Sequence, residues 1–525
     1  MPEKIYLVDL TAYDPATDQE VICRFSTYGF DAGNGIYYEP RIIQPGTLSR
    51  SISTGQIGGR QAVSYGEISL AAIDGGIDYL ADYYFDAREA VLRVGRVGQP
   101  FDSFEVIMRA QMEAVSVERE VVSIRLRDRA VTLERPFSTA KYLGTNYAPE
   151  VPEGEDEVFL GLEGTADDIK DRQKPFIGGR VSLMEPVLVN TGQLIYQCHM
   201  YRVDAVLNVF DSGVYLNREL DSYKTVAELQ DEAFAPNAGY YRVYSGPEGT
   251  FFKLGSSPSG TVSCSVVESW TRNSAAELIR RAIEYASYFS PTSTAPSDAW
   301  DWHHWDLLAL DEANASPLGI VLEDGETTAS VLDRICESVG AFWGFDSLGK
   351  LRVVRIDEPA ATPDLTLIGQ EMTEADRTPE GQMPFWSVTV QSDRNYITQD
   401  KNSMAGIVPA ARAEWFAPEY RKSNVKDEDI RTTRLLAQEG DYTSLLAGIG
   451  PAQVEAQRRL DLFSVRRDVG TITVPDPGQY GDALDLGKTV QVVLPRLGYN
   501  TGRNMIVIGI QTDWGRDQAT VTLWG

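Results

Sequence analysis

The sequence predicts a mainly β protein with α+β insertions, divided into several domains. From residue 1 to about 140, short runs of β-branched and aromatic residues recur with Gly, Asn and Asp between them, a spacing typical of a barrel or sandwich. The clearest helical patterns are confined to about 271–370 and 451–463. The 525-residue chain is also too long for one ordinary core, so three or four domains are expected.

The first predicted domain is a β-barrel covering residues 1–140. Its expected strands are 5–12, 62–70, 90–97, 103–112 and 121–128. A helical pattern interrupts them at 76–86, where Ile77, Leu80 and Tyr84 share one face and would cap or cross the barrel.

The second predicted domain, residues 141–270, is β-rich and has an acidic linker at its start. Strands are expected within 176–189, 194–199 and 205–214. The acidic, proline-bearing segment 147–157 marks the boundary. It lacks the Asx-Gly spacing of a calcium loop, which favours a solvated linker.

The third predicted domain, residues 271–370, is an α+β unit. Ser274 and Glu277 have the spacing of a capping box at the start of a first helix. A second helix should begin near Thr328 and end at Gly340, a typical C-terminal glycine. Strands at 341–345 and 350–356 would complete a helix–hairpin unit.

The fourth predicted domain, residues 371–525, ends in a second β-barrel. A strand is expected at 386–396 and a helix at 451–463, with Pro451 at its first position, whereas 403–450 is polar and gives no clear pattern. The remaining strands are predicted at 469–474, 486–494, 505–511 and 518–524. β-structure up to the last residue indicates that the terminus is tied into a sheet. No repeat of fixed period is visible, although the first and last domains could both be barrels.

The net charge of the chain is strongly negative. Asp and Glu number 76 against 48 Lys and Arg, giving −28. A protein that grips nucleic acid needs clusters of Lys and Arg, so direct DNA binding is disfavoured. An acidic wall would suit a conduit through which DNA slides, although acidity also simply keeps proteins soluble.

The cysteines give no sign of a metal site or a redox motif. They are far apart and form no CxxC pair, so reduced, mostly buried thiols made in a cytoplasm are expected. They are Cys23, Cys198, Cys264 and Cys336.

The three histidines are the scarcest reactive side chains. His303 and His304 lie in the aromatic and acidic segment 301–306, but adjacent residues point in different directions on a helix or strand. A packed or interface-facing loop is therefore favoured over a metal or sugar site. His199 follows Cys198 on a predicted strand without the surroundings of a nucleophile pair, which favours a structural role.

No motif assigns catalysis. The sequence contains no Gly-x-Ser-x-Gly elbow, His-Glu-x-x-His or phosphate-binding loop. The glycine pairs in 58–60 and 178–180 are interpreted as turns or bulges. A carboxylate pair for glycoside hydrolysis cannot be located from sequence. We therefore predict no catalytic, cofactor-binding or metal-ligating residue and no cofactor, and we expect a protein that is not an enzyme.

Several aromatic groups could form carbohydrate platforms, but use in a core or a protein interface is favoured. They are Tyr37-Tyr38, Tyr83-Tyr84-Phe85, Tyr240-Tyr241 and Trp302.

No apolar run approaches the length of a membrane span, and residues 1–8 lack the pattern of a signal peptide. Neither membrane insertion nor Sec export is expected.

Several segments, in order along the chain, resemble the tail hub (baseplate hub) proteins of long-tailed bacteriophages and gene transfer agents. The resemblance extends over the N-terminal barrel pattern and most of the chain in scattered pieces. The matching pieces are Lys174-Pro175 with Gly178-Gly179-Arg180, Phe210 to Gly213, the helix–hairpin at 328–356, Arg394-Asn395-Tyr396, and the module from 451 to the end.

The resemblance implies two tail-tube-like β-barrels per chain and a homotrimeric ring at the tail tip that adapts a sixfold tube to threefold tip proteins. It implies as neighbours a distal tail or tube protein, the tape-measure protein and fibre or spike proteins, with DNA only as passing cargo. The virion tail tip, assembled in the host bacterial cytoplasm, would be its location. The alternatives are a tail-associated cell-wall or polysaccharide hydrolase and a host-receptor-binding module.

Overall fold

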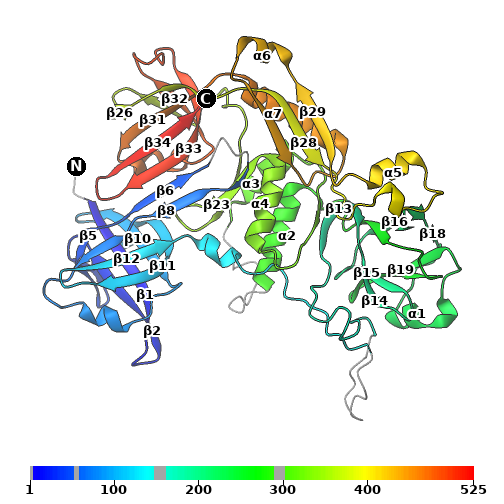
Figure 1. Ribbon diagram of the computed structural model, residues 1–525. Coiled ribbons are helices and arrows are strands. Elements are labelled where there is room, and N and C mark those ends of the chain that lie inside the picture. The colour runs from blue at the N-terminus through cyan, green and yellow to red at the C-terminus, as the bar shows by residue number, and fades with distance from the viewer. Residues whose placement is uncertain (1–3, 53–57, 147–160, 289–301) are drawn as a thin grey trace.

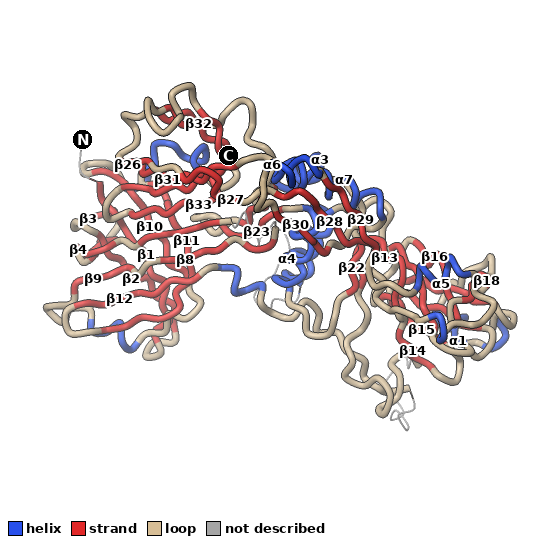
Figure 2. The backbone as a smooth tube through the Cα atoms, turned by 45° about the horizontal axis from the view of Figure 1, so that its top comes forward, coloured by secondary structure: helices blue, strands red, loops and turns tan. Residues whose placement is uncertain are grey.

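The structure of the chain is a computed structural model that describes residues 4–52, 58–146, 161–288 and 302–525. Two large sheets lie side by side at one end of the molecule, and two smaller sheets lie at the other end (Figure 1). Helices gather between them, as Figure 2 also shows. The prediction of a mainly β protein with α+β insertions is confirmed.

The N-terminal sheet alternates its side chains between two cores. Tyr6, Val8 and Leu10 lie in the large core of the sheet. Ile5 and Leu7, on the opposite face of the same strand, pack under the β3–β4 hairpin. The nine strands, in spatial order, are β3 (Phe30–Gly33), β4 (Ile36–Pro40), β2 (Gln19–Ser26), β1 (Lys4–Asp14), β10 (Glu89–Arg96), β11 (Glu105–Val117), β12 (Val121–Arg127), β9 (Ile68–Ala71) and β5 (Ile42–Gln44).

The C-terminal sheet contains the last strands of the chain and two strands from its N-terminal part. Its main path is β25 (Leu365–Ile368), β32 (Thr489–Val493), β33 (Arg503–Asp513), β34 (Gln518–Trp524), β31 (Arg467–Pro475) and β26 (Glu374–Ala375). Beside this path lie β27 (Thr378–Gln382), β6 (Thr47–Ser51) and β8 (Ala62–Tyr65). Val490, Val507 and Val521 are fully buried in its core.

In each large sheet, two strands that follow one another closely in the chain pair near opposite ends of the strand order. β4 pairs with β2 and β5 pairs with β9, and only Arg41 separates β4 from β5. Likewise β25 pairs with β32 and β26 pairs with β31, with residues 369–373 between them. The described strands therefore wrap around each core without a continuous ring of strand pairs.

Two five-stranded sheets enclose a separate core at the far end of the molecule. Tyr196, Phe252 and Val266 are among its buried residues. One sheet contains β17 (Val214–Tyr215), β16 (Ala205–Asp211), β21 (Val262–Val267), β13 (Ile177–Met184) and β22 (Gly319–Val321). The other contains β14 (Val187–Asn190), β15 (Ile195–His199), β20 (Gly249–Leu254), β19 (Tyr240–Gly246) and β18 (Asn217–Arg218), and the short helix α1 (Val226–Gln230) follows β18 in the chain.

The largest core lies in the middle of the molecule and combines helices with short sheets. Helix α4 (Thr328–Val339) begins at Thr328 and ends at Gly340, whose φ is 69°, as the sequence predicts. The capping box of Thr327 and Ser330 at its start is an additional finding. It packs on β23 (Ala341–Phe345), which pairs with β24 (Leu351–Arg355) and β7 (Gly59–Arg60). The other members are α2 (Ala275–Tyr288), α3 (His304–Ala313), β28 (Phe385–Ser392), β29 (Arg421–Lys426), β30 (Gln438–Thr443) and α7 (Ile449–Ser464). Helices α5 (Ala410–Phe416) and α6 (Glu428–Thr433) lie outside this core.

The two large sheets share a four-stranded repeat. In the N-terminal sheet, β9 pairs with β12, β12 with β11, and β11 with β10. In the C-terminal sheet, β31 pairs with β34, β34 with β33, and β33 with β32. A 3-10 helix joins the first two strands of each copy, η1 (Asp78–Asp82) in one and η6 (Pro477–Leu484) in the other.

The repeat extends to the register of the strands. The pairs Gln111–Arg127, Met112–Leu126 and Val115–Ile124 correspond to Ile506–Trp524, Val507–Leu523 and Ile510–Val521, and both copies have a bulge after the second pair. Ile68–Ile124 corresponds in the same way to Ile472–Val521.

The chain before the second strand of each copy is also equivalent. Ala87 N donates to Met112 O over 2.9 Å, as Gly487 N donates to Val507 O over 2.8 Å, and both donors have positive φ. This degree of backbone equivalence identifies β9–β12 and β31–β34 as two copies of one structural unit.

Two local predictions are corrected. The expected strand 62–70 is split at Gly66, so β8 joins the C-terminal sheet while β9 stays in the N-terminal sheet. The expected helix 76–86 is only the 3-10 helix η1, although Ile77 and Leu80 enter the core as predicted, and Tyr84 stays exposed. The acidic linker 147–157 lies outside the described residues.

Candidate functional site: the seam between the two large sheets

The two large sheets are joined by exchanged backbone. β6 leaves the N-terminal part of the chain and pairs with β33, from Ser51 opposite Gly509 to Thr47 opposite Asp513. β8 pairs with the other side of β6. We call β6 and β8 together the first arm. Because the arm adds main-chain hydrogen bonds to the C-terminal sheet, the two sheets form one continuous unit.

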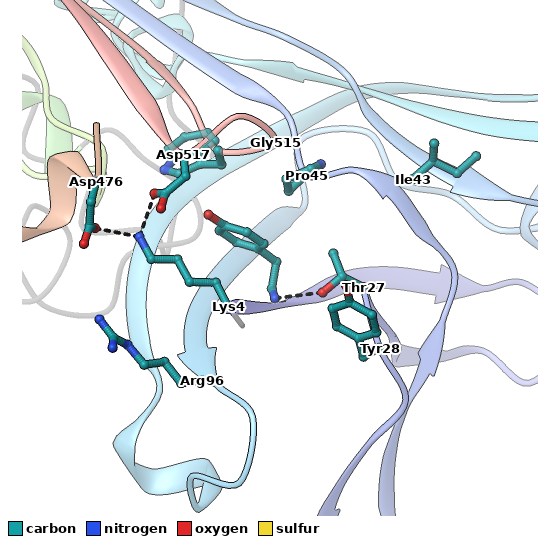
Figure 3. Close-up of a pocket in the computed structure, with 11 residues that line it drawn as sticks. Lys4, Thr27, Tyr28, Ile43, Pro45, Arg96, Asp476, Gly515 and Asp517 are labelled. Atoms are coloured by element: carbon teal, nitrogen blue, oxygen red, sulfur yellow. Dashed lines mark hydrogen bonds and ion pairs between the residues drawn. The ribbon is translucent and has the colours of Figure 1, made fainter. Parts of the chain in front are cut away.

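Lys4 links the two sheets at the same seam, beside the turn between β33 and β34 (Figure 3). Its Nζ lies 2.6 Å from Asp476 Oδ1 and 2.6 Å from Asp517 Oδ1. Asp476 N also donates to Asp517 O over 2.8 Å, which holds the two turns together. Burial would lower the pKa of Lys4, but the hydrogen bonds to the two carboxylates outweigh it and raise this pKa.

A groove of about 380 Å³ lies beside Lys4. Tyr28, Ile43, Pro45 and Arg96 line it together with Lys4, as Figure 3 shows. A second cavity of about 340 Å³ lies between β11, the 346–348 turn and the chain around Asp482. Both are open, mixed in polarity and set along the line where the sheets meet.

Asp485 is the buried charge that connects three parts of the chain at the seam. It accepts hydrogen bonds from Arg50 Nη2 of the first arm at 2.6 Å and from Arg352 Nη1 of β24 at 2.9 Å. Arg352 also donates through Nε to Asp306 of α3 at 2.6 Å. Burial would raise the pKa of Asp485, but the charges of Arg50 and Arg352 outweigh it and lower this pKa.

The chain between β6 and β8 is anchored in the central core. β7 pairs in parallel with β23, and the Arg60 guanidinium lies 4.9 Å from the Trp343 ring and bonds with Glu134 and Asp333. A Cβ at Gly58 would lie 2.6 Å from Glu337 Cα, so this position has no room for a side chain. Gly58 forms a bend and both glycines have positive φ, in keeping with the expected turn or bulge, and their missing side chains let the short strand β7 approach α4.

A second buried cluster attaches α7 to the central core. Glu455 accepts from Arg458 Nη2 at 2.7 Å and from Arg459 Nε at 2.7 Å. Arg459 in turn donates to the Glu337 carbonyl over 2.6 Å. Burial alone would raise the pKa of Glu455, but the bonds from Arg458 and the charge of Arg459 hold it at about 2.

The histidines have structural surroundings. His303 Nε2 lies 2.8 Å from Asp346 Oδ2, in the turn of the β23–β24 hairpin, so this part of segment 301–306 docks onto the hairpin. His304 begins α3. His199 is 1% exposed and its Nδ1 accepts from Ile177 N over 3.0 Å. Burial lowers the pKa of His199 to about 3, so its ring is neutral at physiological pH.

The cysteines are all buried, and burial raises the pKa of Cys23 to about 11. Cys198 and Cys264 lie in the same core of the five-stranded sheets. Within the parts of the chain that the structure describes, no three His, Cys, Asp or Glu side chains gather in a way that could hold a metal ion.

The paired tyrosines divide between surface and core, as strand alternation requires. Tyr37 is exposed, whereas Tyr38 is buried and donates to Asp9 Oδ1 over 2.9 Å. Tyr241 is buried in the core of the five-stranded sheets, next to the half-buried Tyr240. Neither pair presents two adjacent rings on one surface.

Two of the segments that carry the resemblance, the one at Gly178-Gly179 and the one at Arg394, lie where different elements of the chain contact one another. Gly178 and Gly179 lie in β13 and pair with β22, and a Cβ at Gly179 would lie 2.1 Å from the Leu318 carbonyl. This corrects the expectation of a turn or bulge. Arg394 pairs with Glu323 at 3.1 Å and with Glu419 at 3.0 Å.

No described helix is long and apolar enough to cross a membrane.

No protein-family model and no curated protein matches the chain. Among solved structures, it is similar to the 43 kDa tail protein of prophage MuSo2 from Shewanella oneidensis, with 12% identity, a TM-score of 0.40, and coverage of 99% of this chain and 98% of that one. It is also similar to the prophage tail protein gp18 from Listeria monocytogenes EGD-e, with 9% identity, a TM-score of 0.39, and coverage of 100% and 94%.

A third similar chain is part of the virion of a native gene transfer agent particle, with 13% identity, a TM-score of 0.36, and coverage of 67% of this chain and 84% of that one. The similar structures are thus two prophage tail proteins and a chain of a gene transfer agent virion.

Proposed function

We propose that this chain is a structural tail hub that forms a homotrimeric ring at the tip of a phage tail. The observation that supports this proposal is the repeat: each chain carries two equivalent units, β9–β12 and β31–β34, joined by the first arm. Three chains would place six equivalent units around one axis. Such a ring matches a sixfold tube on one side and threefold proteins on the other.

The proposed partners follow from this position. A distal tail or tube protein would contact the sixfold side, fibre or spike proteins the threefold side, and the tape-measure protein and DNA would pass through the centre. Three chains of charge −28 give −84, and we place part of this charge on the lumen so that DNA slides without adhesion. The ring would be assembled in the host cytoplasm and act in the virion without catalysing a reaction.

We also propose a domain division near residues 140, 270 and 370. Residues 47–65 are the exception, because the first arm serves the C-terminal sheet. Limited proteolysis should therefore cut near 147–157 before it cuts within the first arm.

The direct test is the mass and shape of the purified full-length chain. Light scattering should give three times 58.1 kDa, about 174 kDa, and electron microscopy should show a ring with six similar units and an open centre. A particle that stays at 58.1 kDa at high protein concentration, with no ring in the images, contradicts the proposal.

A further inference from the structure

One of the two repeated units lacks a strand that the other has. In the C-terminal sheet, β6 covers the edge of β33 along Gly509–Asp513. By the shared register, the equivalent stretch of β11 begins at Ala114 and includes Val115 and Ser116. Among the described residues, no strand pairs with β11 on this edge, since its pairing with β10 stops at Gln111.

The side chains along this unpaired stretch of β11 are at least partly exposed, although the 3-10 helix η1 also lies against β11. Ala114 and Ser116 are exposed, and Val115 and Val117 are only half-buried. A bare strand edge of this kind is a template for another strand, and proteins ordinarily cover it.

The chain also has a second arm with a free edge. β27 pairs with the start of β31, Thr378 opposite Val469 and Gln382 opposite Arg467. Ile472 of β31 and Ile68 of β9 are equivalent positions. Counting back by the same number of residues makes Val469 equivalent to Tyr65, which pairs with Leu48 of β6. β27 is therefore the counterpart of β6. In the described parts of the chain, β27 pairs with no other strand, and Thr378 and Pro379 are exposed.

We propose that β27 of one copy pairs in antiparallel register with the Ala114–Val117 edge of β11 in a second copy. This inference rests on the proposed ring and names its subunit contact. Within the residues that the structure describes, each chain has two arms and two acceptor edges, and one arm already fills one edge within the chain. The remaining arm, β27, and the remaining edge, that of β11, are the counterparts of β6 and β33, which pair within one chain. The β11 edge of a second copy is therefore the partner that fits β27. Head-to-tail contacts of this kind form a ring when the rotation from one copy to the next closes, as the proposed trimer requires.

The proline in β27 fits this register. Ile52 N donates to Ile508 O over 2.8 Å, and hydrogen-bonded pairs alternate along antiparallel strands. Ser49 opposite Gln511 is therefore a pair without mutual hydrogen bonds at that edge. The register of β27 against β31 shifts between Thr378 and Gln382. We place this shift after Pro379, which then takes the position of Ser49, so its missing N–H is not needed for pairing with β11. By the same alternation, the amide of Val115 faces the open edge.

A disulfide test measures the contact directly. Pro379 should face Ser116 of the next copy as Ser49 faces Gln511, and close non-hydrogen-bonded pairs suit a disulfide. We expect the variant carrying S116C and P379C to form covalent dimers and trimers under mild oxidation, visible on a non-reducing gel. The matched control, S49C with Q511C, should form its disulfide within one chain and leave the denatured mass unchanged. Each single variant should stay monomeric on the gel, because the native thiols are buried.

The outcomes separate this inference from the proposed function. A trimer by light scattering that gives no cross-link with S116C and P379C overturns the β27–β11 contact and leaves the ring intact. A monomer by light scattering without a cross-link overturns both. Cross-linked material that extends beyond three chains supports the contact and contradicts the trimeric ring.

A second variant tests the edge without cysteine. Val115→Pro removes the N–H that faces the open edge, and proline is tolerated where an edge strand faces solvent. We expect the trimer to dissociate at least tenfold more readily while the circular dichroism spectrum of the chain is unchanged. An unchanged trimer contradicts the proposal, and if the variant fails to fold, the cysteine pair decides.

Discussion

Removing the Asp485 carboxylate tests whether the buried charges hold the seam together. Asp485 and Arg50 are 8% and 7% exposed, and Arg50 makes its one described ion pair with Asp485. Arg352 keeps Asp306 when Asp485 is lost, so Arg50 alone is left as an uncompensated buried charge. Breaking a buried pair in this way costs about 3–5 kcal/mol, and the lower value applies because only one partner is stranded.

The expected effect of Asp485→Ala is therefore a loss of about 3 kcal/mol in the local stability of the seam. This corresponds to amide exchange in β6 and the facing part of β33 that is about a hundredfold faster than in the unmodified protein. Hydrogen exchange followed by mass spectrometry measures it segment by segment, which avoids treating several domains as one two-state unit.

Two variants make the result interpretable. Asp86→Ala removes an exposed carboxylate 3.9 Å from Arg88, and exchange should stay unchanged because surface pairs contribute little. Replacing both partners, Arg50→Met with Asp485→Leu, should restore most of the protection. If Asp485→Ala exchanges within threefold of the unmodified protein in β6, the reasoning is refuted.

Three further predictions concern single positions. The pKa of Glu455 is about 2, below its usual 4.5, so the contribution of its carboxylate to folding stability is complete above pH 4.5 and is lost as pH falls toward 2. In urea unfolding, Glu455→Gln should be less stable than the unmodified protein by on the order of 3 kcal/mol at pH 6. This difference should vanish near pH 2. The pKa of His199 is about 3, below its usual 6.5, so the unfolded chain takes up the proton first and the folded state loses stability as pH falls from 6.5 to 3. In thermal melts at different pH, any stability advantage of the unmodified protein over His199→Gln should shrink over that range. A constant difference would count against a buried neutral ring. A Cβ at Gly487, where φ is 80°, would lie 2.2 Å from Val354 Cγ1, so Gly487→Ala should cost about 2–4 kcal/mol in urea unfolding; Ala87→Gly at the equivalent site should change stability by less than about 1 kcal/mol, and equal effects would contradict the steric explanation.

The elements of the C-terminal part could largely be predicted from sequence because their side chains show one clear period. The alternation at 469–474, 505–511 and 518–524 gives β31, β33 and β34, and the helix near Pro451 is α7, although it begins two residues earlier at Ile449. Gly340 ends α4 as expected, because only a residue tolerant of positive φ suits that position. The polar stretch 403–450 contains short elements that make no local pattern.

The repeat could not be predicted because backbone pairing is preserved while side chains are not. Phe85 corresponds to Asp485, Ala87 to Gly487, and Met112 to Val507. The insertions between equivalent strands also differ in length, so no fixed period remains. Each unit keeps only inward apolar residues at alternate positions, a requirement that many different sequences satisfy.

The seam was beyond sequence analysis for another reason. Arg50 and Asp485 look like ordinary surface charges in their local context, and 435 residues separate them. Only the fold shows that they meet in a buried site. The same holds for Lys4, whose two carboxylate partners lie in turns near the other end of the chain.

The exchange of β6 into the C-terminal sheet has a consequence for biosynthesis. A ribosome adds about 5–20 residues per second, so β6 emerges about 20–90 s before β33, its partner strand, exists. During that interval the nascent chain carries an unsatisfied strand edge, which is an aggregation hazard. Occupancy by a chaperone, or temporary folding back of the arm, would protect it, and premature termination before β33 would leave a chain that adheres to others.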